Sequence, residues 1–389
     1  MADAYDFWAE RITAGEAAAI VRFWEAFVKA APAIDGTFSG TSEPVDVAAE
    51  MANALGNLND AVTSWEFGPV EGGHFLALSP ELDHVKRPLM RAMVRRAPDI
   101  PRFEFCDARR PHTDLDVVPD VVASRMARPF SLSGAKATEG DHRRVDITGC
   151  GGSADAAHQA ALLFSIIVGE EIERDWLGEI HAERTGGGFV SRLFGSGDPP
   201  TEPMSWLPGF EEEAMSTLAR LMDARPAARM GDPVPPDSEG ALYQSEPHDS
   251  DNPRADAITY QTVHTDYAAA RFAGARISSV RFSRHGESFL GLRIERTAEQ
   301  PFNEVADRAE ISEALDAQLR AAGAGGVFGE GHGKGHVYID FATTDIELAI
   351  ASVERELGRL DVAGPAAILF DEAGLEDKVL PLRIAGTAH

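Results

Sequence analysis

Residues 336–358 read HVYIDFATTDIELAIASVERELG, a strand-like segment followed at once by a strongly marked helix. Thr344 and Glu347 have the spacing of a capping box, which predicts the start of that helix, and Gly358 predicts its end. Between them, apolar side chains recur at the spacing of one helix face: Ile346, Ile350, Val353 and Leu357. The stretch therefore predicts a strand that passes directly into an amphipathic helix.

The neighbouring sequence supplies the other elements of the same domain. Strand-like stretches occupy residues 258–263, 277–282, 289–294, 336–341 and 366–371, and 379–384 is a further candidate. A further helix has Ile311, Leu315 and Leu319 on one face and ends at Gly323. The order of these elements, ββαβαβ, has split βαβ geometry. We therefore predict a ferredoxin-like α+β domain over residues 257–389, with the helices on one face of an antiparallel sheet.

The first half of the chain predicts a separate α+β domain over residues 1–195. Thr13 and Glu16 form a capping-box pattern for a long helix, which we expect Pro32 to end. Two strand-like stretches, 65–67 and 74–78, flank a glycine-containing turn and predict a β-hairpin.

Ser79 and Pro80 follow this hairpin and have the pattern of an N-cap and a first helical residue. They predict a helix that stops before Pro98. Residues 196–256 then join the two domains through one amphipathic helix and a connector. Its core, residues 231–253, holds five prolines, six acidic residues and no Lys or Arg, so we expect an exposed connector.

The overall charge limits the classes of partner. The chain has 63 acidic and 36 basic side chains, which gives a formal net charge of −27. Such a surface repels nucleic acid and anionic lipid and attracts a basic protein. It also disfavours polyanionic substrates unless a local basic pocket intervenes.

Cysteine usage and hydropathy predict a cytoplasmic protein without a membrane segment. Cys106 and Cys150 have no paired spacing, which excludes a cysteine zinc module and a disulfide framework. The first ten residues lack the pattern of a secretory signal. The longest apolar run, residues 160–169, is too short to span a bilayer.

Arg284-His285-Gly286-Glu287-Ser288 resembles the signature of the histidine phosphatase and phosphoglycerate mutase superfamily. The resemblance implies a phosphorylated histidine and an arginine that grips phosphate. Apolar residues alternate on both sides of the segment, however, which predicts a β-hairpin that turns at His285-Gly286. We interpret the match as a coincidence. A phosphoryl-transfer or hydrolytic enzyme using Arg284, His285 and Glu287 is the alternative.

The glycine-rich stretch 326–341 is the second candidate site. Gly331, Gly333 and Lys334 have the residue types of a phosphate-binding loop, but not the spacing of a P-loop or a dinucleotide fingerprint. We predict a flexible hairpin loop and no cofactor. His336 and Asp340 share one side of the following strand, where a solvated sheet face is expected rather than a metal site.

A second resemblance covers about a third of the chain. Residues 64–82, 87–111 and 329–358 are similar to uncharacterised bacterial proteins that accompany toxin–immunity loci. A tryptophan-bearing strand, a Ser-Pro helix start and an Ala-Pro stop before an aromatic strand carry the resemblance. It implies a class and no catalytic residues. The leading hypothesis is therefore a non-catalytic protein of immunity or adaptor type that binds another protein, with a basic partner favoured by the charge.

Overall fold

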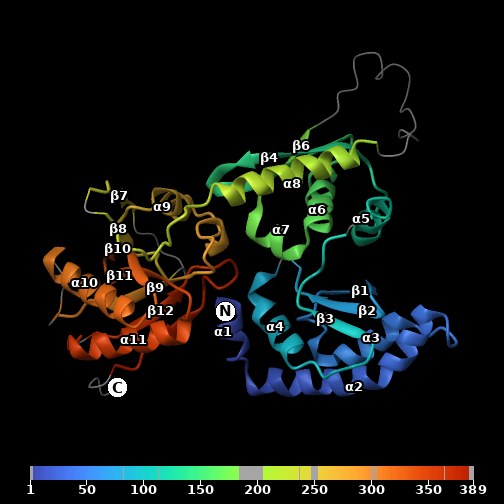
Figure 1. Cartoon of the computed structure of the whole chain (residues 1–389), viewed down its shortest axis with the longest axis horizontal. Helices are drawn as coiled ribbons and strands as arrows, with labels where there is room; N and C mark the ends of the chain where they lie inside the picture. Colours follow the sequence, from blue (N-terminus) through green and yellow to red (C-terminus); the bar gives the residue numbers. More distant parts are fainter. Residues whose placement is uncertain are drawn as a thin grey trace, which may run out of the picture. The chain divides into compact units, whose positions relative to one another are not determined.

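The computed structural model describes residues 3–384, apart from 82, 113, 184–204, 236, 247–252, 299, 301, 303–304 and 363. These residues form α-helices and three mostly antiparallel sheets, so the predicted α+β class is confirmed (Figure 1). The chain divides into two compact units. The first, here called the C-terminal unit, comprises Met1–Ile12, Asp83–Pro88 and Arg225–His389; the second, the N-terminal unit, comprises Thr13–Leu82 and Leu89–Ala224.

The N-terminal unit begins with the long helix α2, Ala14–Ser39. The predicted capping box is present, because Thr13 accepts a hydrogen bond from the Glu16 amide and the Glu16 side chain bonds back to Thr13. The expectation that Pro32 ends the helix is wrong. Proline removes one backbone hydrogen bond, but the buried side chain of Ile34 lies beyond it and anchors the last turns in the core.

A three-stranded sheet follows in the order β1-β2-β3. Its strands are β1 (Ser64–Val70), β2 (Gly73–Ser79) and β3 (Phe103–Cys106), and the predicted hairpin between β1 and β2 is confirmed. The helix expected from Pro80 does not start there. Ser79 is still part of β2, and its hydroxyl accepts a hydrogen bond from the Glu81 amide in a turn. Helix α4 (Arg87–Arg95) begins only after that turn, and α3 (Val47–Leu55) precedes β1.

A second three-stranded sheet has the order β4-β5-β6. Its strands are β4 (Leu132–Gly140), β5 (Arg144–Gly151) and β6 (Leu177–Glu183), with the helices α5 (Val118–Met126), α6 (Ala156–Val168), α7 (Glu170–Trp176) and α8 (Leu207–Asp223). Helix α6 packs on β5 and β6, and α8 runs along β4 (Figure 1). The Glu213 carboxylate accepts a hydrogen bond from the Ala137 amide, so α8 covers the outer edge of β4.

The C-terminal unit contains a seven-stranded sheet in the order β13-β12-β9-β11-β10-β8-β7, and every neighbouring pair is antiparallel. The strands are β7 (Ala241–Gln244), β8 (Ala257–Thr262), β9 (Ser288–Glu295), β10 (Gly326–Gly333), β11 (His336–Thr343), β12 (Ala366–Phe370) and β13 (Val379–Pro381). The helices are α1 (Ala4–Ala9), α9 (Thr265–Phe272), α10 (Val305–Ala321) and α11 (Ile346–Arg359).

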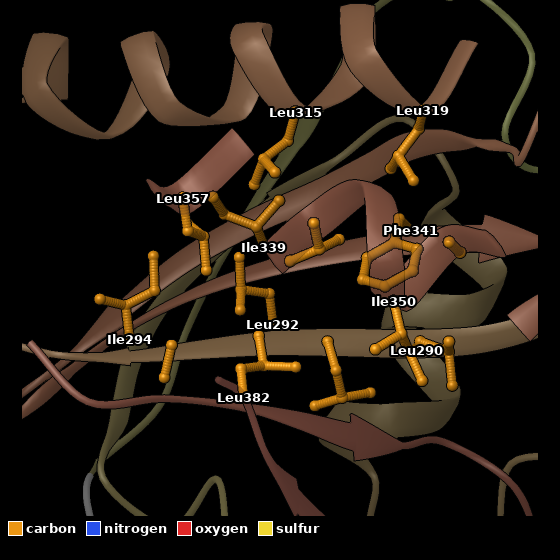
Figure 2. Packing of buried hydrophobic residues seen from close by; sticks show 14 of the residues in the cluster. Leu290, Leu292, Ile294, Leu315, Leu319, Ile339, Phe341, Ile350, Leu357 and Leu382 are labelled. Atoms are coloured by element: carbon orange, nitrogen blue, oxygen red, sulfur yellow. The ribbon is translucent and has the colours of Figure 1, made fainter. Parts of the chain in front are cut away.

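One face of this sheet carries the main hydrophobic core. Leu290, Leu292 and Ile294 of β9 point into the same cluster as the apolar faces of α10 and α11. Figure 2 shows Leu315 and Leu319 of α10 directed toward the strand residues. Helix α1 belongs to the same cluster, since the ring centroids of Phe7 and Phe370 lie 5.4 Å apart.

The helix that follows β11 starts one residue later than expected. Asp345, not Thr344, is the N-cap of α11, and its carboxylate accepts a hydrogen bond from the Leu348 amide. Thr343 in turn accepts from the Asp345 amide and fixes the approach to the cap. The helix also continues through Gly358 to Arg359. Within the described part of the chain, no helix combines the length and apolar character needed to cross a bilayer.

Candidate functional site

Arg284 and His285 both hold the backbone of residues 225–231. Arg284 Nε donates to the Pro226 carbonyl at 3.0 Å, and His285 Nε2 lies 2.7 Å from the Ala227 carbonyl. A carbonyl oxygen only accepts, so His285 carries its proton on Nε2 in this contact. That nitrogen then has no lone pair to offer a phosphoryl group. The geometry gives a phosphohistidine at Nε2 no support.

Glu287 binds the same segment from the interior. Its side chain is buried, and the carboxylate accepts hydrogen bonds from the Met230 amide at 3.0 Å and the Gly231 amide at 3.3 Å. The Ser283 hydroxyl donates to the same carboxylate. Arg284, His285 and Glu287 thus converge on one backbone segment and stabilise its conformation.

The prediction of a β-hairpin around His285-Gly286 is wrong for the strand before the turn. Gly286 has a positive φ of 65°, as a turn requires, and β9 follows it. The preceding residues 279–281, however, form a short 3₁₀ helix rather than a strand. Arg281 and Phe282 are both buried, and the Ser279 amide donates to the Glu372 carboxylate at 3.1 Å. Consecutive residues of this segment are therefore held in the interior, whereas a strand would bury every second side chain.

The glycine-rich stretch is mostly strand rather than flexible loop, because Gly331 and Gly333 belong to β10. The backbone amides after this strand bind an internal residue, Asp256. The Lys334 amide donates to the Asp256 carbonyl at 3.1 Å, and the Gly335 amide donates to the carboxylate at 2.7 Å. Both contacts place Asp256 where an anionic ligand of the loop would have to bind. The candidate phosphate loop therefore already encloses a carboxylate of the protein itself.

Two side chains of β11 complete the surroundings of Asp256. His336 Nδ1 lies 3.1 Å from its carboxylate, and the Tyr338 hydroxyl donates to the same group. Burial opposes ionisation of Asp256, but the hydrogen bonds from Tyr338 and Gly335 outweigh it and hold the pKa of the carboxyl below its usual value. His332 pairs instead with Thr259 at 2.7 Å. No group of three or more His, Cys, Asp or Glu side chains suited to a metal ion occurs among the residues that the structure describes.

The glycines of β10 let a neighbouring strand approach closely. A Cβ atom would come within 2.1 Å of the Tyr260 hydroxyl at Gly329, and within 2.4 Å of the Thr259 carbonyl at Gly331. At Gly333 it would lie 2.5 Å from the carbonyl of the residue before β8. The run of glycines is thus explained by the packing of β10 against β8.

Asp340 is the centre of a charged cluster on the sheet face opposite the main core. The solvated face expected there is wrong, because the Asp340 side chain is fully buried. Its carboxylate pairs with Arg254 Nη1 at 2.9 Å and with Arg271 Nη1. Asp371, just after β12, pairs with Arg254 Nη2 at 2.8 Å. Two carboxylates and two guanidinium groups therefore share one site that the sequence motifs did not reveal.

Two tyrosines border this cluster. The Tyr267 hydroxyl donates to Asp371 at 3.0 Å and accepts from Arg271 Nη1 at 2.9 Å. Burial opposes ionisation of Asp340, yet the two guanidinium groups outweigh it and hold the pKa of that carboxyl below its usual value. Burial, reinforced by the Asp340 charge, raises the pKa of the Tyr260 hydroxyl well above its usual value. The cluster is consequently a network in which two carboxylates and two guanidinium groups pair with one another, with neutral tyrosines around it.

A pocket of about 340 Å³ opens beside the cluster. Its wall includes Arg254, Arg271 and Asp371, so the ion pairs form part of its surface. The remaining wall is largely apolar and also carries two further charges; its residues include Phe272, Ile277, Leu369, Arg276 and Glu376. The pocket is at the lower end of the size range of small-molecule sites.

The outer strand β7 has an open edge. It pairs antiparallel with β8, and among the described residues no strand pairs with its other side. The Ser245 amide donates to the Ile258 carbonyl at 3.0 Å, so alternate residues of the strand face β8. The backbone N–H and C=O groups of Leu242 and Gln244 therefore face outward. Leu242 is also 63% exposed.

Acidic side chains flank this strand in the sequence. Residues 231–246 include four exposed carboxylates and no Lys or Arg; the four are Asp232, Asp237, Glu239 and Glu246. The stretch was predicted as an exposed connector, and the strand inside it was not predicted. Its four residues, ALYQ, are too few to show a periodic pattern.

Comparison with protein-family models, with curated proteins and with solved structures finds no match to this chain.

Proposed function

We propose that the protein is a non-catalytic binding protein whose partner is a protein with a basic, extended segment. The observation that carries the proposal is the open edge of β7 within an acidic stretch. Natural proteins usually protect such edges by keeping the strand very short, as β7 is, or with lysine, proline or a covering element. The strand itself has neither lysine nor proline. An edge left open in this way suits the addition of a strand from another chain.

The outward groups of β7 suit the backbone of such a segment. Leu242 and Gln244 offer two N–H and two C=O groups, which is enough for a short antiparallel or parallel pairing. Backbone bonds of this kind give affinity, and side-chain contacts give specificity. The exposed Leu242 side chain offers the apolar contact.

Charge favours a basic occupant over other extended segments. The carboxylates of Asp232, Asp237, Glu239 and Glu246 flank the strand, and the whole chain has a net charge of −27. These charges accelerate the approach of a basic segment and repel an acidic one. Because salt screens the attraction, association should slow as the ionic strength rises.

Immunity or adaptor function is the most concrete version of this proposal, since both work by occupying a partner protein. The resemblance to proteins of toxin–immunity loci supports that version. Two free cysteines, Cys106 and Cys150, support a cytoplasmic location, where disulfides are rare. The strand order β12-β9-β11-β10, with α10 and α11 in the two crossovers, supports classifying this part of the chain as ferredoxin-like.

The test is affinity capture with the full chain at low and moderate salt, combined with one edge variant. Leu242→Pro removes an outward N–H group and leaves the inward pairs of β7 in place. Leu348→Ala, which changes an exposed leucine on α11, is the matched control. We expect a basic protein to be captured by the wild type and by Leu348→Ala, and to be lost with Leu242→Pro or with added salt.

Hydrogen exchange locates the contact. In the complex, the outward amides of Leu242 and Gln244 should exchange more slowly than in the free protein. A partner that Leu242→Pro retains, or one that leaves these two amides unprotected, would refute the edge as the binding site. Concentration-dependent dimers lost in Leu242→Pro would instead identify a second copy of the chain as the occupant and overturn the basic partner.

A further inference from the structure

We infer that the pocket beside the Arg254–Asp340–Arg271–Asp371 cluster binds a small organic monocarboxylate with an apolar body. This goes beyond the proposed protein binding, because it concerns a different site and a different class of ligand. Three guanidinium groups line one pocket of a chain in which acidic residues outnumber basic ones by 63 to 36. With Asp371 and Glu376 also on the wall, the lining still carries one more positive than negative charge, against the net negative charge of the chain.

The guanidinium of Arg271 has N–H groups that its ion pairs do not use and that could bind a ligand. Its ion pairs and hydrogen bonds to Asp340, Asp371 and Tyr267 all use Nη1. Among the described residues, Nε and Nη2 of Arg271 make no hydrogen bond or ion pair, so their N–H groups remain available. A guanidinium edge with two parallel N–H groups matches the two oxygens of a carboxylate.

Arg276 supplies a second cation on the pocket wall. Its side chain is exposed, and within the described part of the chain its guanidinium makes no hydrogen bond or close ion pair, although its charge acts on the Glu376 carboxylate of the same wall. Its backbone carbonyl accepts a hydrogen bond from Arg281, which fixes the position of the residue. Arg271 and Arg276 lie on either side of the end of α9.

The rest of the wall selects the body and the charge of the ligand. Phe272, Ile277 and Leu369 offer an apolar surface on which an aromatic or aliphatic group loses contact with water. Asp371 and Glu376 also line the pocket, and they disfavour a second negative charge on the ligand. A volume of about 340 Å³ admits a compact molecule and excludes a nucleotide-sized one bearing several phosphates.

Benzoate is the probe for this proposal, with benzyl alcohol and benzylamine as neutral and cationic analogues of the same size. Binding is measured by calorimetry and by the melting temperature at constant ionic strength. We expect benzoate to bind saturably and to raise the melting temperature, while the two analogues have no effect. The same titration with inorganic phosphate should give no binding.

Two variants place the site. Arg276→Gln removes an exposed charge and should weaken benzoate binding about tenfold, the loss expected for a charge-assisted hydrogen bond. Arg355→Gln, an exposed arginine on α11, is the matched control and should bind benzoate as the wild type does. Ala275→Leu should fill part of the pocket and abolish binding.

Several results would overturn the inference. Equal binding of benzoate and benzylamine would show that charge does not select the ligand. Binding that Arg276→Gln leaves unchanged would place the ligand elsewhere, and this variant stays informative even where Ala275→Leu fails to fold. Phosphate binding without benzoate binding would exclude a monocarboxylate site. So would the absence of benzoate binding at a concentration of about 10 mM, which is tenfold above a millimolar Kd.

Discussion

The Arg254 guanidinium lies against the bare Cα atom of Gly291, in the middle of β9, an inner strand of the seven-stranded sheet. A Cβ atom at Gly291 would come within 1.8 Å of Arg254 Nη2 and within 2.9 Å of the Asp340 carboxylate. Leu290 and Leu292 on either side point into the apolar core on the opposite face. The missing side chain thus provides the space in which the ion pairs form.

Gly291→Ala is expected to destabilise the protein by about 1–3 kcal/mol, because the methyl group overpacks a rigid, buried site. Urea unfolding followed by circular dichroism measures the loss. Gly358→Ala is the control, since a Cβ atom there meets nothing within 4 Å. In a helix this change should leave stability equal or raise it by up to about 1 kcal/mol. Equal unfolding midpoints for Gly291→Ala and the wild type would contradict the packing.

Asp340→Asn should lower the free energy of unfolding by about 3–5 kcal/mol at neutral pH, because it leaves two largely buried guanidinium groups with one carboxylate between them. The pKa of Asp340 is lower in the folded than in the unfolded chain. Its stabilisation is therefore complete above the unfolded pKa, about 4, and is lost as the pH falls through the folded pKa. The difference in unfolding free energy between the wild type and Asp340→Asn should therefore become smaller below about pH 4.

Urea titrations at several pH values check this prediction. The exposed Asp377→Asn serves as the matched control and should change stability by less than about 0.5 kcal/mol. A gap between wild type and Asp340→Asn that stays constant from neutral pH to about pH 3 would be inconsistent with an ionised, paired Asp340.

His264 should make the protein less stable as the pH falls below neutrality. Burial holds its pKa below the usual value, even though its ring contacts the Met230 carbonyl at 3.2 Å. The unfolded chain then takes up a proton more readily than the folded one. The stability that the neutral His264 ring contributes is fully present above the unfolded pKa, about 6.5. It declines as the pH drops toward the folded pKa.

His264→Gln removes this titration and should flatten the decline in unfolding midpoint between about pH 7 and pH 5. The exposed His158→Gln should leave the wild-type slope unchanged. A steeper slope for His264→Gln than for the wild type would reverse the assigned direction of the shift.

Glu287→Gln and His285→Ala separate a structural from a catalytic role of the Arg-His-Gly-Glu segment. The first replaces a buried carboxylate that accepts from two backbone amides, so we expect a loss of about 1.5–3 kcal/mol. The second removes one hydrogen bond at a half-buried side chain and should cost about 0.5–1.5 kcal/mol. Urea unfolding measures both. Hydrolysis of a phosphate ester by the wild type that His285→Ala abolishes would support the enzyme alternative instead.

Much of the C-terminal sheet was predictable because its strands are buried and long enough to show their pattern. The strands at 258–263, 289–294, 336–341 and 366–371 were all recognised, as was the helix α10 that ends before Gly323. The strand β10 was missed because its glycines carry no side chains from which a period could be read. The strand expected at 277–282 does not form. Several consecutive side chains there are buried, whereas a strand with one buried face would bury every second one.

The charged cluster could be located only in part from sequence. A lone aspartate inside the apolar strand HVYIDF is a signal, because a buried charge requires a partner. The partners themselves are distant in the chain: Arg271 is 69 residues from Asp340, and Arg254 is 117 residues from Asp371. No local pattern specifies such pairings. They follow from the sheet order, which brings β9, β11 and β12 together.

The alternating glycines of β10 have a consequence for recognising relatives of this chain. Any side chain at Gly329, Gly331 or Gly333 would displace part of the adjoining strand, so these three positions should accept almost no substitution. Arg284 and His285, by contrast, make hydrogen bonds to backbone carbonyls that several other side chains could make. A glycine at every second position, about 70 residues after a tyrosine that stands where Tyr260 stands, is therefore the signature by which divergent members of this lineage should be sought.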